Sequence, residues 1–162
     1  YLHPVAVALI DIDGFAELNR AHGTAGGDAV LREVALRMRL RVREADELGR
    51  IGSDSFLAVL PHTEESGAAT FADAIQHRLA LRPVGIGDTE LRVTASVGVA
   101  VMRSGEALDV DGLLSRAEEA LASAKRAGGD RIALDRLHGL ARLEDHRPPE
   151  LRGHDSAVDA DD

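Results

Sequence analysis

The chain of 162 residues contains no cysteine, which excludes disulfide bonds and zinc sites with cysteine ligands. Aromatic residues are scarce, with no tryptophan, one tyrosine and three phenylalanines, so Ala, Val, Leu and Ile must build most of the core. No stretch approaches the ~20 apolar residues of a membrane-spanning helix, and no signal peptide is visible. Because the chain starts without Met inside an expected strand, we expect a cytoplasmic fragment of a longer protein that makes no membrane contact through this segment.

The chain also lacks a surplus of positive charge, because 28 acidic residues outnumber 19 basic ones. Binding to nucleic acid requires a basic face, so we expect no nucleic-acid partner. Much of the acidic excess lies in residues 144–162, which hold seven acids and two arginines. Hydrophobic periodicity is lost after residue 136, and the sequence therefore predicts one domain over residues 1–136 and an acidic, disordered tail or linker over residues 137–162.

An apolar content of 44% is typical of a globular domain. The continuous apolar run of residues 4–10 predicts a strand that is buried on both faces. Hydrophobic periodicity and turn residues predict further strands at 46–51, 56–60, 84–86, 91–102 and 131–134, and helices at 14–22, from 26 to about 42, after 63, and at 110–127. Hairpins that alternate with helices predict an α+β domain whose mostly antiparallel sheet has about five strands.

The polar stretch of residues 50–56 lies between two apolar runs and predicts the tip of a β-hairpin. Asp11 ends the first strand, and Asp54 lies at the hairpin tip. If the two strands are neighbours, their carboxylates and the carbonyl of Ile12 converge at one edge of the sheet and form a candidate Mg²⁺ site. The alternative is that Asp11 is a solvated strand end, Asp13 caps the following helix and Asp54 only serves the turn.

Ordered blocks of the chain resemble GGDEF domains, the diguanylate cyclases, which join two GTP molecules into cyclic di-GMP. Residues 11–31 resemble the DxDxFKxxND…GHxxGDxxL opening of that family, and residues 50–56 its R-x-GGDEF signature. Residues 94–100 resemble the T-x-S-x-G-V-A strand, and residues 117–131 the closing A-D-x-A-L-Y-x-A-K-x-x-G-R-N-R helix. The resemblance covers about residues 4–134 and implies a palm-like fold of the nucleotidyl cyclase or ferredoxin-like type, with the active site at the hairpin.

The resemblance also implies roles for individual residues. Asp11, the carbonyl of Ile12 and Asp54 match the family's ligands for Mg²⁺ or Mn²⁺, with Asp54 in the catalytic signature. The residues that match its GTP-binding positions are Asn19, Asp28, Gly52, Ser53 and Lys125. The implied cofactor is the divalent ion that accompanies the nucleotide, and no covalently bound cofactor is implied.

The chain departs from the family pattern at four positions near this site. Ser53 replaces a glycine and Ser55 replaces the glutamate of the signature, so a carboxylate becomes a neutral hydroxyl. Ala16 stands where the family has lysine, and Gly129 where it has arginine. Because these groups position phosphates and neutralise their charge, we expect a degenerate signature with little or no cyclase activity.

Arg43 and Asp46 precede the hairpin and match the RxxD inhibitory site of the family, which binds cyclic di-GMP. A guanidinium can pair with phosphate or with guanine O6 and N7, and a carboxylate accepts from guanine N1 and N2. The sequence thus favours a regulatory module that binds cyclic di-GMP or GTP beside other domains of a larger signalling protein. Two alternatives stay open, namely a weakly active cyclase that works as a homodimer, and a protein-interaction module that binds no nucleotide.

Overall fold

The computed structural model describes residues 3–135, so the prediction of a tail over residues 137–162 lies outside the described residues. A five-stranded sheet has the order β2-β3-β1-β6-β7, and only the β6–β7 pair is parallel. Its strands are β1 (Val5–Ile12), β2 (Glu47–Arg50), β3 (Ser55–Pro61), β6 (Ala95–Met102) and β7 (Ile132–Leu134). The predicted α+β domain with a mostly antiparallel sheet is therefore confirmed.

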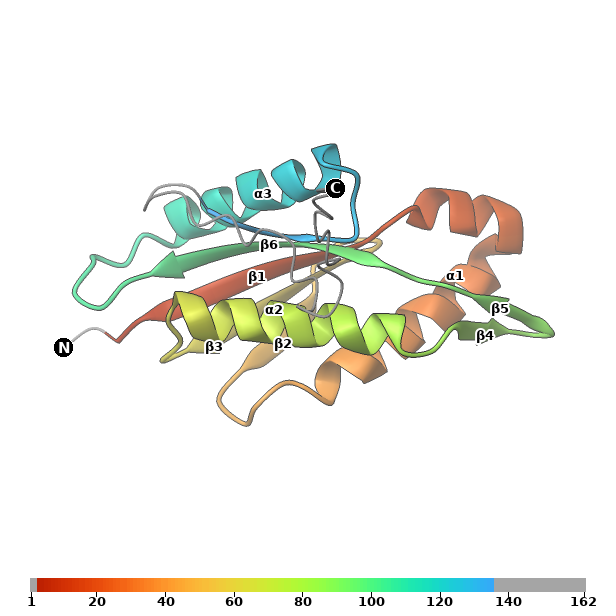
Figure 1. The fold of residues 1–162 in the computed structure, drawn as a ribbon, viewed down its shortest axis with the longest axis horizontal. Helices are drawn as coiled ribbons and strands as arrows, with labels where there is room; N and C mark the ends of the chain where they lie inside the picture. The colour runs from red at the N-terminus through yellow and green to blue at the C-terminus, as the bar shows by residue number, and fades with distance from the viewer. Residues whose placement is uncertain (1–2, 136–162) are drawn as a thin grey trace, which may run out of the picture.

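Helices cover both faces of this sheet (Figure 1). On one face lie α1 (Phe15–Arg39) and α2 (Glu65–Ala80), and on the other lies α3 (Val110–Arg126). A short ribbon of β4 (Val84–Ile86) and β5 (Thr89–Leu91) extends from the end of α2. The strand β1 is buried on both faces along nearly all of its length, as its continuous apolar run predicts. Within residues 3–135, no helix is long and apolar enough to cross a membrane.

The predicted break between two helices at Gly23 is confirmed, but two element boundaries differ from the prediction. The two helical stretches of α1 meet at Gly23 (φ 71°, ψ 174°), because glycine readily adopts that positive φ. The second stretch resumes directly after Gly23 instead of at Gly26, and it ends at Arg39 instead of at about residue 42. The expected strand over residues 91–102 is divided, since β5 ends at Leu91 and β6 begins at Ala95.

Asp13 does not cap α1. The N-cap position of that helix is Gly14 (φ 65°), which makes no side-chain capping bond. The Asp13 carboxylate instead accepts hydrogen bonds from Thr94 Oγ1 (2.8 Å), Ser96 Oγ (2.7 Å) and the backbone N–H of Asp130 (2.9 Å). It therefore joins the end of β1 to the start of β6 and to the turn that follows α3.

Gly98 lets α3 lie directly on β6. A Cβ atom at this position would come within 2.3 Å of the carbonyl oxygen of Ala117 and of the backbone nitrogen of Leu121, both on α3. Because the obstacle is helix backbone, which cannot rotate away, only glycine fits here. This close packing fixes the position of α3, whose last turn carries Lys125 over the end of β1.

We predict that Gly98→Ala lowers the free energy of unfolding by about 2–3 kcal/mol, because the added methyl group forces α3 away from the sheet. Gly85→Ala is the matched control, since a Cβ at that strand position meets nothing within 4 Å. Urea denaturation of both variants measures the difference. Equal stability of the two variants would contradict the packing argument.

Candidate functional site

The ends of β1 and the β2–β3 hairpin bring two carboxylates together. Asp11 lies opposite Ser55 in the antiparallel pairing of β1 with β3. The backbone N–H of Ile12 donates to the carbonyl of Asp54 (3.1 Å), which extends that pairing to the hairpin tip. The Ser55 hydroxyl lies 3.5 Å from Asp11 Oδ1 and 3.5 Å from Asp54 Oδ1. The carboxylates of the first strand and of the hairpin therefore flank one serine hydroxyl.

Lys125 forms an ion pair with Asp11. Asp11 is only 5% exposed, so an uncompensated charge there would be costly. The ammonium group comes from the last turn of α3, while 46% of the lysine side chain stays accessible to solvent. Lys125 thus neutralises the buried carboxylate of Asp11, while nearly half of its own side chain stays exposed.

The hairpin tip is held by Arg50. Its guanidinium donates to the carbonyl of Gly52 (2.8 Å) and to the carbonyl of Ser53 (2.8 Å). The Ser53 hydroxyl donates to Asp54 Oδ1 (3.1 Å). The sequence analysis assigned no role to Arg50, which is the first residue of the signature-like stretch of residues 50–56. Its position gave a usable signal, because an arginine two residues before a turn can reach the carbonyl groups of that turn.

The kink in α1 packs its two halves against each other beside Asn19 and Asp28. A Cβ atom at Gly27 would overlap Asn19 Oδ1, so the amide of Asn19 lies directly against the backbone of the second half. Within the described residues, Asn19 Oδ1 is buried and has no hydrogen-bond partner. Asp28, which follows Gly27 in the chain, is exposed. An unpaired amide oxygen beside an exposed carboxylate can accept hydrogen bonds from a ligand.

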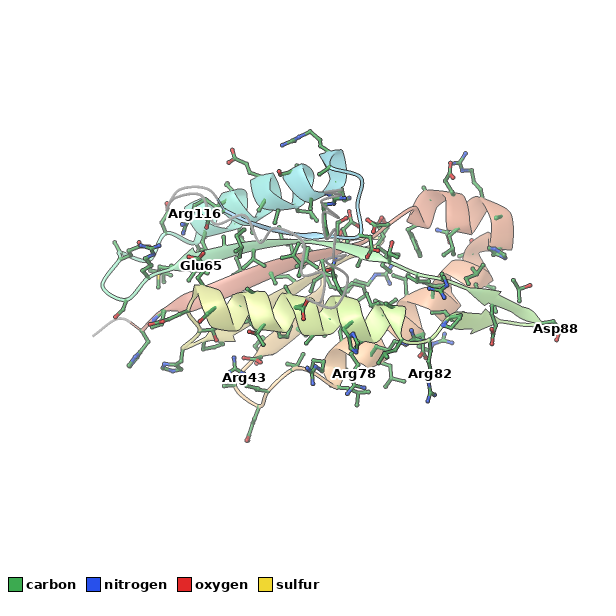
Figure 2. All side chains as sticks on the ribbon, in the orientation of Figure 1. Arg43, Glu65, Arg78, Arg82, Asp88 and Arg116 are labelled. Carbon is green, nitrogen blue, oxygen red and sulfur yellow. The ribbon has the colours of Figure 1, made fainter. Side chains whose placement is uncertain are left out.

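Arg43 and Asp46 form a compact pair on the segment that joins α1 to β2, where Figure 2 labels Arg43. Asp46 Oδ2 accepts from the backbone N–H of Arg43 (2.9 Å) and from its Nε (3.3 Å), and Arg43 Nη2 donates to Thr63 Oγ1 (3.0 Å). The Asp46 side chain is 1% exposed and the Arg43 side chain 62% exposed. Among the described residues, Asp46 Oδ1 has no hydrogen-bond partner. The pair therefore places an accessible guanidinium beside a buried carboxylate oxygen that lacks a partner within the described residues.

The carboxylate pair supplies only part of a metal site. Within residues 3–135, no group of three or more His, Cys, Asp or Glu side chains could hold a metal ion. Asp11, Asp54 and the Ile12 carbonyl are hard oxygen donors of the kind that Mg²⁺ takes, and the ion usually completes its octahedron with water and phosphate oxygens. The donor set therefore fits an ion that arrives with a phosphorylated ligand.

The positions of Ala16 and Gly129 offer no cation to this site. Ala16 is exposed in the first turn of α1. Gly129 has a positive φ of 74°, and a Cβ there would lie 3.1 Å from Asp13 Oδ1. A side chain at residue 129 would therefore be strained and would crowd the Asp13 carboxylate.

Comparison with protein families gives a match over residues 2–131 to the model described as "Diguanylate cyclase, GGDEF domain". Diguanylate cyclase DgcP of Pseudomonas aeruginosa is 33% identical over 126 residues, which cover 78% of this chain and 18% of that protein. Response regulator PleD of Caulobacter vibrioides is 37% identical over 131 residues, which cover 80% of this chain and 29% of that protein. The chain therefore spans less than a third of the length of these relatives.

Solved structures agree with these matches. The GGDEF domain of PA1120 (TpbB or YfiN) from Pseudomonas aeruginosa superposes with a TM-score of 0.78 at 32% identity, covering 83% of this chain and 78% of that one. The GGDEF domain of DgcB from Caulobacter crescentus, solved in complex with c-di-GMP, gives a TM-score of 0.76 at 28% identity, covering 81% of this chain and 77% of that one. The fold and both sets of matches show that this chain belongs to the GGDEF domain family of diguanylate cyclases.

Proposed function

We propose that this domain acts in cyclic di-GMP signalling as a regulatory module that binds guanine nucleotides and has little or no cyclase activity. The observation that carries the proposal is the buried, unpaired Oδ1 of Asp46 beside the exposed guanidinium of Arg43. A buried acceptor without a partner costs about 1–3 kcal/mol, and a ligand that donates to it removes that cost. Cyclic di-GMP fits this pair, because its guanine N1 and N2 groups donate while its phosphates and its O6 and N7 atoms accept from guanidinium.

We predict that cyclic di-GMP binds to the wild-type chain, and that Arg43→Ala weakens binding at least about tenfold by removing charge-assisted hydrogen bonds. Isothermal titration calorimetry measures both affinities. Arg82→Ala is the control, because Arg82 is an exposed arginine beyond the end of α2, far from Arg43 in Figure 2. Equal affinities of wild type and Arg43→Ala would refute this site. Absence of binding by both cyclic di-GMP and GTP would favour a protein-interaction module instead.

The proposed loss of cyclase activity follows from missing charge at the hairpin. Phosphoryl-group chemistry depends on positioning and on neutralising the charge that develops in the transition state. Ser55 places a hydroxyl where a carboxylate would act, and residues 16 and 129 supply no cation. Each lost group can lower the rate by about 10²–10³, by analogy with the deletion of single oxyanion-hole donors. The signature is degenerate because Ser55 lacks the charge of a carboxylate, although the carboxylates of Asp11 and Asp54 still lie on either side of it.

We predict no detectable cyclic di-GMP from the wild-type chain with GTP and Mg²⁺ or Mn²⁺. The triple variant Ala16→Lys, Ser53→Gly, Ser55→Glu should raise turnover by at least about 10², because it restores one cation and one carboxylate to the site. Chromatography of the nucleotide products measures both rates at high protein concentration, so that two chains can each present one GTP. Measurable cyclic di-GMP production by the wild type, at a rate equal to that of the triple variant, would establish that the wild type is an active cyclase.

We further propose that GTP binds with a divalent ion held by Asp11, Asp54 and the Ile12 carbonyl. When bound, the ion would neutralise charge on the phosphates. Lys125 contacts Oδ2 of Asp11, so a divalent ion at this carboxylate would compete with the ammonium group for its negative charge. In the absence of the ion, Lys125 serves as the counter-charge that keeps Asp11 stable in its buried position.

We predict that Lys125→Met melts at a lower temperature than the wild type and that millimolar Mg²⁺ raises its melting temperature by about 3–6 °C more than that of the wild type. The physical reason is that the ion replaces the missing counter-charge of Asp11. Differential scanning fluorimetry with and without Mg²⁺ measures the effect. Arg126→Met, a change at the next residue of α3, should respond like the wild type. An equal response of the Lys125 variant to Mg²⁺ would rule out this competition.

A further inference from the structure

A groove of about 620 Å³ lies at the end of the sheet that is opposite the hairpin. The start of α2, the residues before β1, and the ends of β6 and β7 form its walls. The side chains on its floor are apolar and come from Pro4, Ala69, Val101 and Leu134. No residue that lines this groove belongs to the candidate metal site, the candidate GTP positions or the RxxD pair, so it is a separate surface.

The rim of the groove carries more negative than positive charge. Glu65, which Figure 2 labels on α2, lies 3.8 Å from the guanidinium of Arg103, and both side chains are about half exposed. Glu64 also lines the groove, is exposed, and forms no ion pair with any residue between 3 and 135. An apolar floor under an acidic rim suits an occupant that combines apolar side chains with positive charge.

The chain itself leads into this groove. The strand β7 is at the edge of the sheet, and its last residue, Leu134, lines the groove. Asp135 lines a smaller adjoining cavity that shares Glu65, Val101 and Leu134 with the groove. Residues 136–162 follow directly, and Leu137 cannot lie more than about 11 Å from Leu134, because only three residues separate them.

The first eight of these residues differ in composition from those after them. Residues 136–143 contain three leucines at every third position and two arginines, and they contain no acid: Arg136, Leu137, Leu140, Arg142 and Leu143. All the acids beyond Asp135 begin at Glu144. The segment 136–143 therefore carries the apolar side chains and the positive charge that the floor and rim of the groove suit, whereas the residues after it would be repelled by the acidic rim.

We propose that the segment 136–143 binds in this groove of its own chain, with its leucines against the apolar floor and its arginines beside Glu64 and Glu65. The short connection to β7 keeps the segment at a high effective concentration, so even weak contacts fill the groove. Binding there also covers the outer edge of β7, which would otherwise be open to pairing with other chains. The inference does not depend on the proposed function, because the groove shares no residue with the candidate nucleotide sites.

The test is disulfide trapping in the whole chain, which has no cysteine of its own. Ala69→Cys puts one thiol in the groove, and a second cysteine replaces each leucine of the segment in turn. Ser115→Cys is the matched control, because Ser115 is exposed on α3 next to Arg116, which pairs with Asp135 (3.3 Å). The control thiol is thus also near the start of the segment, but on the other face of the sheet. In a glutathione redox buffer, we expect at least one segment cysteine to pair with residue 69 at least about tenfold faster than with residue 115.

Equal rates for the two partners, or faster pairing with residue 115, would overturn the inference, because a segment that is only tethered reaches both faces. Disulfides that form mainly between two chains would also overturn it and would indicate that a second copy occupies the groove. A second measurement avoids introduced thiols. Replacing the three leucines of the segment by serine should speed amide hydrogen exchange of residues 65–72 at least about threefold, whereas Leu151→Ser should not. Unchanged exchange in the triple serine variant would equally refute the docking.

Discussion

The pairing of β1 with both of its neighbours is the constraint on which the rest of the structure depends. Because β1 is central and antiparallel to β3 and β6, its register places Asp11 between Ser55 and Ser96. A shift of one residue would turn every side chain of β1 to the other face and would move Asp11 away from the hairpin. The carboxylate of Asp13 holds this end of the strand, since it ties β1 to β6 and to the turn after α3.

Charge balance at the end of β1 links the fold to its chemistry. A buried Asp11 requires a positive partner, and in this structure Lys125 provides one from α3. The position of Lys125 in turn depends on Gly98, which allows α3 to lie against β6 without an intervening side chain. One helix contact therefore decides whether the chain itself neutralises the buried carboxylate of Asp11.

Most of the fold could be predicted from the sequence, because its signals are local. The apolar run of β1, the hairpin and the periodic helix α3 each lie within a residue or two of their predicted bounds. Asp13 was assigned wrongly because its partners Thr94 and Ser96 are more than 80 residues away in the chain, and no local pattern reveals them. For the same reason the sequence gave no sign of the contact between Lys125 and Asp11, although the family resemblance assigned Lys125 to GTP binding. The sequence also gave no sign of the groove of about 800 Å³ between α1 and β2, which is lined by residues such as Leu31, Arg39 and Leu48. This groove forms only when the kinked helix and the edge strand come together in the fold.

We propose that this GGDEF domain binds a guanine nucleotide without converting it. The most direct test is to purify the chain, denature it, and identify any released nucleotide by mass spectrometry, both as isolated and after incubation with GTP and Mg²⁺. We predict that a guanine nucleotide is released and that GTP added during incubation is recovered unchanged. Release of no nucleotide under either condition, or accumulation of cyclic di-GMP from the added GTP, would contradict it.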